Sequence, residues 1–468
     1  MRCEQCNLIL IIIDALRYDR LNHVTAPFLT KFAKQSIVFE NAYSVTNATD
    51  PSITSMLTAL YPLSHGIIEH GEKVKPEHLL YLPFIEFLQE ILRNHGYITI
   101  AIDFLGRWHK RGFDMYLEPE TFYKRIQRKI IEHMPLKLKF HIKRTLRSRI
   151  LATPMKRKLM QPYDASKATN FAIEILRRTM KKNKKFFMLI HYWDVHIPYN
   201  APSVFIRKLA KVSYNDDDRT IRDLAKEIKG PWYNKLRDIF GENSKIRTIL
   251  ALYDASVAYV DQQVRRIIEF LEENKLLDRT VLVITSDHGE SLGEHSIWFD
   301  HHGLYEVNIH VPLILHIPGI AGRKIKSFVQ HVDLVPTLLE ILRLKHNIVC
   351  DGIRLPIINE SYVRAYIYAE ESYVERKFAI RVGKYKYITA LKPQNAFCRY
   401  CHKIHGGIEE LYNLSKDPGE EINIINSEPD VAKELRFKLL NLINNMIKFR
   451  ILRRIKSIRE KLKSNDTT

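Results

Sequence analysis

Four apolar runs along the chain each end at an aspartate. They cover residues 7–13, 97–103, 186–194 and 280–287, and their aspartates are Asp14, Asp103, Asp194 and Asp287. Each run is short and rich in β-branched or aromatic residues, a composition that favours buried strands over helices. The pattern therefore predicts at least four strands that are buried on both faces.

Amphipathic segments lie between these runs, for example at residues 79–95 and 248–276, and both are predicted to be helices. Alternating strands and helices predict an α/β fold with a mostly parallel central sheet that has helices on both faces. In such sheets ligands bind at the carboxyl ends of the strands. We therefore expect the four aspartates to converge on one site.

The 468 residues exceed the usual size of a single core, so a smaller companion domain is expected. We predict a catalytic α/β domain at residues 1–355, with helical insertions at about 115–165 and 200–245. The segments 378–391 and 409–414 resemble antiparallel strands, which predicts a C-terminal α+β subdomain at 356–446. A long helix begins at Pro429, and its basic end forms a tail at 447–468.

The formal charge of +20 is concentrated in two segments. Residues 124–158 contain thirteen Lys or Arg and one acid, and residues 448–463 contain eight and one. Basic amphipathic helices either contact anionic membranes, here through 124–158 and 447–463, or present a solvated face. Nucleic acid is not an expected partner. The longest apolar run near the start is too short to span a membrane, which predicts a soluble, cytoplasmic protein.

The five cysteines are too few for a disulfide scaffold. Four of them form two CxxC pairs, Cys3 with Cys6 and Cys398 with Cys401, while Cys350 stands alone. The two pairs would close a structural zinc site if the termini meet, with His402 and His405 as alternative ligands. Separate thiol pairs without metal, or a disulfide, are the other interpretation.

The segment TSDHGE (285–290) places Asp287 beside His288 at the end of a strand. A carboxylate and an imidazole are a common ligand pair for a divalent transition metal, and Asp14 supplies a third ligand. Near the start of the stretch NATDPSITSMLTALYP, the hydroxyl of Thr49 or Ser52 could cap a helix that begins near Pro51. Thr49 could also act as a nucleophile, and the two roles are compatible. A cation bound to that hydroxyl would make it easier to deprotonate.

Other segments of the chain contain further candidate substrate-binding and metal-binding residues. His196 could bind a transferring anion or protonate a leaving oxygen, and with Asp194 it could hold a second ion. At least one of His301 and His302 is expected to point inward. Arg107 and His109 are either anion ligands or solvated side chains.

Several motifs occur together in one order: LIIIDALRYDRL, TDPSITSMLTALYP, SDHGESLGEH, HVDLVPTLLEIL and GKYKYI followed by ELYNLSKDPGEEINI. In this combination the chain resembles the sulfatase family of the alkaline-phosphatase superfamily, nearly end to end. The resemblance implies an alkaline-phosphatase/sulfatase-like fold and a divalent metal ion (Mn, Zn, Ca or Mg).

The resemblance also implies roles for individual residues. The metal positions fall on Asp14, Thr49, Asp287 and His288, with Thr49 as the nucleophile. The substrate positions fall on His196, on His301 or His302, and, through GRWH, on Arg107 and His109.

Three positions depart from the family pattern. Sulfatases convert a Cys or Ser to formylglycine, whereas this chain has Thr49, and Ile53 and Ala15 stand where an Arg and a second acid are usual. We therefore expect a metal-dependent hydrolase of anionic esters that favours phosphate mono- or diesters over sulfate. The alternatives are a phosphoglycerol- or phosphoethanolamine-type transferase on lipid-linked substrates, or a non-catalytic anion- or lipid-binding relative.

Overall fold

A computed structural model describes residues 3, 5–118, 164–182, 184–211, 218–228, 230–357 and 363–465. Most of the predicted insertion at 115–165, and the whole basic segment 124–158, lie outside these residues. The other insertion, at 200–245, contains α9 (Ser203–Leu209), the 3-10 helix η6 (Asp223–Lys226) and α10 (Pro231–Phe240).

The central sheet has eight strands in the order β10-β2-β9-β6-β1-β5-β3-β4. They are β1 (Asn7–Ile13), β2 (Ile37–Tyr43), β3 (Ile98–Ile102), β4 (Met115–Leu117), β5 (Phe186–Tyr192), β6 (Thr280–Thr285), β9 (Leu313–His316) and β10 (Arg323–Gln330). Only β9 runs antiparallel to its neighbours in this sheet. The predicted mostly parallel sheet is confirmed, and the four aspartate-terminated runs form β1, β3, β5 and β6.

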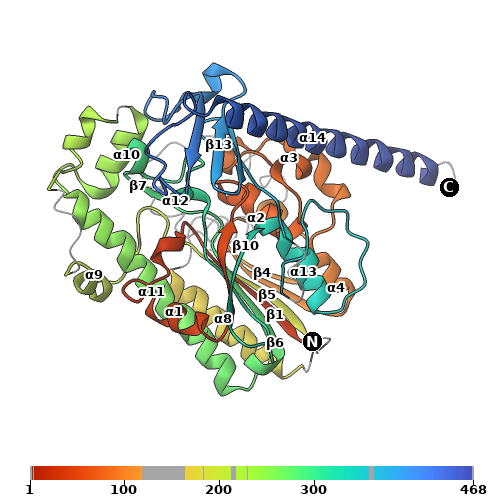
Figure 1. Ribbon diagram of the computed structural model, residues 1–468. Helices are drawn as coiled ribbons and strands as arrows, with labels where there is room; N and C mark the ends of the chain where they lie inside the picture. Colours follow the sequence, from red (N-terminus) through yellow and green to blue (C-terminus); the bar gives the residue numbers. More distant parts are fainter. Residues whose placement is uncertain are drawn as a thin grey trace, which may run out of the picture.

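Helices cover both faces of the sheet (Figure 1). Because side chains alternate along a strand, the odd-numbered residues of β1 from Ile9 face α1 (Pro27–Ala33), α8 (Ala165–Met180) and α11 (Ile246–Glu273). The even-numbered residues from Leu8 face α2 (Thr49–Thr58), α4 (Leu88–Asn94) and α13 (Leu334–Ile341). The sheet thus lies between two apolar cores, and β1 is buried on both.

A second, antiparallel sheet contains β11 (Ile367–Glu371), β12 (Lys377–Val382), β13 (Tyr385–Thr389) and β14 (Glu409–Asn413), in that order. Gly383, with φ of 55°, lies in the tight turn between β12 and β13. The helix α14 (Pro429–Asn465) packs on this sheet through Leu435, Leu439 and Ile443. It continues without a break past residue 446, where the sequence suggested a boundary between subdomain and tail.

The predicted helix at 79–95 is wrong in its first half. A 3-10 helix, η3 (Pro76–Phe84), is followed by extended residues, and α4 begins only at Leu88. Pro83 lacks an amide hydrogen and disfavours α geometry in the residue before it, which accounts for the interruption.

Short elements connect the larger ones. They are η1 (Tyr18–Arg20), α3 (Pro62–His65), η2 (Gly71–Lys73), η4 (Arg107–Lys110), η7 (Leu277–Arg279), β7 (Ser291–Leu292), η8 (Glu294–Ser296), β8 (Trp298–Asp300), α12 (Glu306–Ile309), η9 (His331–Asp333) and η10 (Pro393–Ala396). Strands β7 and β8 pair with each other as a separate hairpin.

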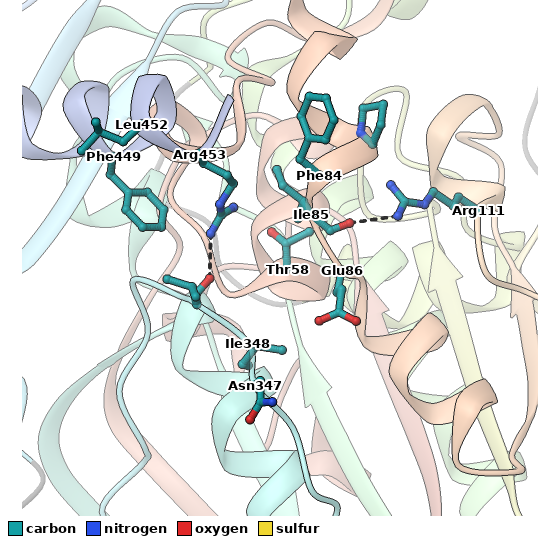
Figure 2. A pocket seen from close by; sticks show the side chains of 12 residues that line it. Thr58, Phe84, Ile85, Glu86, Arg111, Asn347, Ile348, Phe449, Leu452 and Arg453 are labelled. Atoms are coloured by element: carbon teal, nitrogen blue, oxygen red, sulfur yellow. Dashed lines mark hydrogen bonds between the residues drawn. The ribbon is translucent and has the colours of Figure 1, made fainter. Parts of the chain in front are cut away.

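The basic end of α14 contacts the body of the protein (Figure 2). Arg453 donates a 2.9 Å hydrogen bond to the carbonyl of Val349, and the Arg450 guanidinium lies 5.1 Å from the Tyr81 ring centroid. These contacts do not support the predicted membrane contact through residues 447–455. The side chains of residues 456–463, like the other predicted segment at 124–158, lie outside the described residues. Within the described ranges, no helix has the length and apolar character needed to cross a bilayer. The cytoplasmic location stays a prediction.

Candidate active site

Asp14, Asp287 and His288 meet at the carboxyl ends of two adjacent strands. Asp14 directly follows β1, and Asp287 lies two residues after β6, which pairs with β1 in parallel. The Nε2 atom of His288 is 3.6 Å from Asp14 Oδ1 and 3.4 Å from Asp287 Oδ2, and all three side chains are buried. The Nδ1–H of His288 donates to the Gly289 carbonyl at 2.8 Å, which leaves Nε2 free to act as a ligand.

The chemistry of this cluster fits a divalent cation. Both carboxylate oxygens of Asp14 and Oδ2 of Asp287 are buried without a well-aligned hydrogen-bond donor. Burial and the neighbouring charge of Asp287 raise the pKa of Asp14. Buried carboxylates of this kind are costly unless a charge compensates them, and ligand atoms from all three residues lie within 4.8 Å of one another.

Thr49 is the first residue of α2, and its Oγ1 lies 3.3 Å from His288 Nε2. The helix N-cap is Ala48, so the Thr49 hydroxyl does not cap the helix, contrary to one of the two interpretations above. Ser52 Oγ donates to the Asp287 carbonyl at 2.7 Å and ties the first turn of α2 to the Asp287–His288 turn. The amino end of α2 also favours an anion at this position.

His191, which the sequence analysis missed, links Asp103 to this cluster. It is the penultimate residue of β5, with Nδ1 2.8 Å from Asp103 Oδ1 and Nε2 3.3 Å from Asp14 Oδ2. Burial alone would lower the pKa of His191, but the two carboxylates raise it to about 10. Its signal in the sequence is a single polar residue inside the apolar run FFMLIHYW.

Two of the predicted substrate histidines lie beside His288. The His301 ring stacks on the His288 ring at 4.4 Å between centroids, and the His196 ring lies 5.5 Å from His301 and 6.4 Å from His288. Burial lowers the pKa of both His301 and His196, the latter to about 3. His302 instead faces Asp300 and Cys398, so the structure places only His301 of the adjacent pair in this cluster.

Arg107 and His109 lie next to the first turns of α2. Both Asp50 carboxylate oxygens are 2.6 Å from Nη2 of Arg107, and His109 Nδ1 is 3.8 Å from Asp50 Oδ1. His109 Nε2 also lies 3.3 Å from the Thr54 hydroxyl. Burial raises the pKa of Asp50, but the basic groups around it, His70 first, lower it well below its usual range. No sequence pattern singles out Asp50.

The residues suggested for a second ion do not form a cluster. Among the described residues two groups of side chains could hold a metal, and neither contains Asp194 or His196. Both oxygens of the buried Asp194 carboxylate lack a well-aligned hydrogen-bond donor, and burial raises the pKa of Asp194 to about 7.

The predicted zinc site of Cys3, Cys6, Cys398 and Cys401 is not supported. Cys6 directly precedes β1, whereas Cys398 Sγ lies 3.7 Å from Nε2 of His302, which neighbours His301 at the opposite end of that strand. Seven residues of strand separate the two ends by about 23 Å. Ligands of one ion cannot be so far apart.

A cavity of about 610 Å³ lies between α14, η3 and the loop at 347–349 (Figure 2). One of its lining residues is Thr58, the last residue of α2. At a rise of 1.5 Å per residue, Thr58 is about 14 Å from Thr49 along α2. This cavity is therefore separate from the Asp14–Asp287–His288 cluster.

Comparisons with known proteins identify the family to which this chain belongs. The family model "Sulfatase" matches residues 6–344, and the model of the C-terminal region of N-sulphoglucosamine sulphohydrolase matches residues 293–446. The chain belongs to the sulfatase family. Members of this family are ester hydrolases that depend on a divalent metal in general.

Individual relatives are distant in sequence. Human iduronate 2-sulfatase is 25% identical over 373 residues, which cover 72% of this chain and 65% of that protein. An arylsulfatase of Clostridium perfringens is 26% identical over 469 residues, covering 90% of each. The crystal structure of a phosphonate monoester hydrolase of Agrobacterium radiobacter has a TM-score of 0.67 at 20% identity, covering 94% of this chain and 96% of that one.

Proposed function

We propose that the protein is a metal-dependent hydrolase of anionic esters, with Thr49 as the nucleophile and a preference for phosphate mono- or diesters over sulfate. One observation carries the proposal. The Thr49 hydroxyl faces His288 at 3.3 Å, from the amino end of a helix and beside two buried aspartates.

Asp14, Asp287 and His288 would hold the cation, with the Thr49 oxygen as a further ligand. A bound divalent ion supplies positive charge that lowers the pKa of the Thr49 hydroxyl and offsets the charge of the substrate. The chain itself fixes the position of the nucleophile, because Ser52 ties α2 to the Asp287–His288 turn. The amide groups at the start of α2 offer donors to the oxygens of the bound ester.

A threonine nucleophile favours phosphate esters over sulfate esters as substrates. A threonine side chain carries a methyl group on Cβ, so its oxidation gives a ketone and never the aldehyde of formylglycine. A phosphothreonine can be hydrolysed by attack of water at phosphorus. A sulfated threonine lacks the elimination by which a sulfated aldehyde hydrate collapses. That a phosphonate monoester hydrolase has a similar fold agrees with this choice.

His196 and His301 are proposed to contact the substrate. Nδ1 of His196 is engaged with the Ile197 carbonyl at 2.9 Å, which leaves Nε2 for a ligand. Burial lowers the pKa of His196 and favours the neutral imidazole, whereas an anionic ester beside it would raise this pKa and favour proton donation to the leaving oxygen. Arg107 and His109 would act on the substrate mainly through Asp50 and Thr54.

The test compares three substrates on one preparation. Chelated protein, reloaded in turn with Mn, Zn, Ca or Mg, is assayed on nitrophenyl phosphate, bis-nitrophenyl phosphate and nitrophenyl sulfate. We expect kcat/KM for a phosphate substrate to exceed that for sulfate by at least about tenfold, a transition-state difference of ~1.4 kcal/mol. A preference for sulfate would contradict the substrate proposal. Equal activity of Thr49→Ala and wild type would contradict the role of Thr49.

A further inference from the structure

A second cluster of metal-ligating side chains lies outside the reaction site. Cys398, Cys401 and His405 belong to the loop between η10 and β14, and His302 follows β8. All four are buried, with at most 4% of any of them exposed. Cys398 Sγ lies 3.7 Å from His302 Nε2, and Cys401 Sγ lies 3.0 Å from His405 Nε2.

The two imidazoles are oriented as metal ligands. Nδ1 of His302 is 2.9 Å from Asp300 Oδ2, and Nδ1 of His405 is 2.9 Å from the His295 carbonyl oxygen. Each Nδ1 therefore carries the hydrogen, and each Nε2 presents its lone pair toward a cysteine sulfur. Metal-ligating histidines in proteins are held in this way, by a carboxylate or a carbonyl on the other ring nitrogen.

The loop is shaped around the sulfur of Cys398. The amide of Tyr400 donates to this sulfur at 3.4 Å, and the amide of Cys398 donates to the Lys403 carbonyl at 2.8 Å. An amide donor on sulfur favours the thiolate form that binds metal. The spacing Cys-x2-Cys-x3-His is within the range of structural zinc sites.

We propose that Cys398, Cys401, His405 and His302 bind one structural zinc ion. Two thiolates and two imidazoles are a tetrahedral donor set that zinc prefers over the harder cations suited to carboxylates. Ligand atoms of His302, Glu375, Cys398 and His405 lie within 4.8 Å of one another, and Cys401 reaches this group through its 3.0 Å contact with His405. Because Oε2 of Glu375 is 3.1 Å from Lys377 Nζ, we assign Glu375 to the surroundings of the site. This assignment is independent of the function proposed for Thr49.

The zinc ion would connect the C-terminal subdomain to the reaction site. Tyr400, between the two cysteines, donates its hydroxyl hydrogen to the Tyr373 hydroxyl at 2.8 Å. The Tyr373 ring stacks on His301 at 5.4 Å, and His301 neighbours the ligand His302. Zinc would thus fix His301 both through Tyr400 and Tyr373 and through the adjacent ligand His302. The four zinc ligands would therefore be positioning residues for the active site.

Metal analysis tests the ligand set. The full chain, purified with no histidine tag, is dialysed against EDTA, and its zinc content is measured by mass spectrometry. We expect about one tightly held zinc per chain that a thiol-reactive mercurial releases. The Cys398→Ser/Cys401→Ser variant should retain almost none, whereas Cys3→Ser/Cys6→Ser, the matched pair at the other end of β1, should retain the wild-type amount. Equal zinc in both variants would overturn the proposal.

Cobalt substitution covers the case in which the double variant does not fold. With Co²⁺ in place of zinc, wild type should show the thiolate-to-metal charge-transfer band of a tetrahedral site, and His405→Cys, which keeps four ligands, should show a stronger one. The ligands of the reaction site contain no thiol, so this band reports on the cluster alone. Absence of the band in folded wild type, or a disulfide between Cys398 and Cys401 in protein purified under reducing conditions, would overturn the proposal.

Two further variants, Glu375→Gln and Asp300→Asn, distinguish the zinc ligands from the residues that surround them. Glu375→Gln should keep the zinc and the cobalt band, and loss of both would contradict the assignment of four S and N ligands. Asp300→Asn should weaken zinc affinity by about 10- to 100-fold, because it removes the carboxylate that orients His302. An unchanged affinity would contradict that orienting role.

Discussion

The Nε2 atom of His191 lies 3.3 Å from Oδ2 of Asp14, the aspartate at the end of β1. The other ring nitrogen of His191 is held by Asp103 at 2.8 Å. Three adjacent strands, β3, β5 and β1, thus each contribute one member of a buried chain that ends at the metal cluster. We expect Asp103 and His191 to orient Asp14 without being ligands of the metal themselves.

Replacing His191 by Gln should therefore weaken metal binding more than it weakens catalysis at saturating metal. We expect the metal concentration for half-maximal activity to rise by about 10- to 100-fold, the usual effect of losing a partner that orients a ligand. The stabilisation of chelated protein by added metal, followed by thermal unfolding, should shift to the same concentrations. The control is His95→Gln, the same substitution at an exposed histidine. It should change neither the metal requirement for activity nor the stabilisation by added metal. An unchanged metal requirement in His191→Gln would contradict the orienting role.

Thr49→Ser should retain activity and Thr49→Ala should lose it. Serine keeps the hydroxyl at the amino end of α2, whereas alanine removes the nucleophile, and a loss of at least about a thousandfold in kcat is expected. Acid quenching during turnover of a phosphate ester, followed by intact-mass measurement, should detect one added phosphoryl group on wild type and on Thr49→Ser.

The Ile53→Val variant is the matched control, because Ile53 packs in the core on the same helix and carries no polar group. It should lose little activity and accumulate the same adduct. Rapid turnover of Thr49→Ala, or an adduct on another residue, would contradict the assignment of the nucleophile.

Much of the fold could be predicted from the sequence. The apolar runs that end in aspartate are local signals, and they correctly identified β1, β3, β5 and β6 and the end of the sheet where polar groups meet. Motif order identified the family. The 79–95 segment shows the limit of periodicity, since its apolar pattern continues through Pro83 although the backbone does not stay helical.

The finer arrangement of the site depends on tertiary contacts that no local pattern encodes. His301 and His302 are adjacent in sequence, yet they face different clusters, because Asp300 and Cys398 hold one while His288 stacks on the other. Likewise, Cys398 and Cys401 lie far from Cys3 and Cys6, because β1 separates the ends of the sheet. Their actual neighbours, His302 and His405, come from different segments of the chain.

Arg107 should matter first for stability. Asp50 is fully buried, and Arg107 supplies the nearest guanidinium to its two oxygens, while the guanidinium is itself partly exposed. Arg107→Ala should lower the free energy of unfolding by about 1–3 kcal/mol, because the buried carboxylate loses its guanidinium partner. The loss should be smaller than for a fully buried pair, because Asp50 keeps His70 at 3.0 Å and the Gly71 amide at 2.8 Å. In an Asp50→Asn background the same change should cost clearly less, as measured by urea unfolding.

Lys110→Ala, which removes a surface ion pair from the same 3-10 helix, is the control and should have little effect on stability. A rise in KM of Arg107→Ala with unchanged stability would instead assign Arg107 to direct substrate binding.

Asp261 should make the stability of the protein depend on pH. Its carboxylate oxygens accept the amide hydrogens of Phe28 and Leu29 at 3.0 and 2.7 Å, but burial outweighs these bonds and raises its pKa to about 6. The ordinary value is about 3.9, so the folded protein binds more protons than the unfolded chain between these two pH values. The contribution of Asp261 to stability is therefore fully present below about pH 4 and is lost as the pH rises through 6.

Urea unfolding at intervals between pH 4 and pH 7 should show this loss in wild type and not in Asp261→Asn, whatever the offset in stability between the two proteins. Glu273→Gln, an exposed acid on the same helix α11, should keep the wild-type slope. The two amide hydrogen bonds join Asp261 in α11 to the start of α1. Asp261 does not belong to the Asp14–Asp287–His288 cluster, so the Asp261→Asn variant should lose the pH dependence of stability but keep its response to added metal. An identical slope in wild type and Asp261→Asn would show that other buried carboxyl groups set the pH dependence.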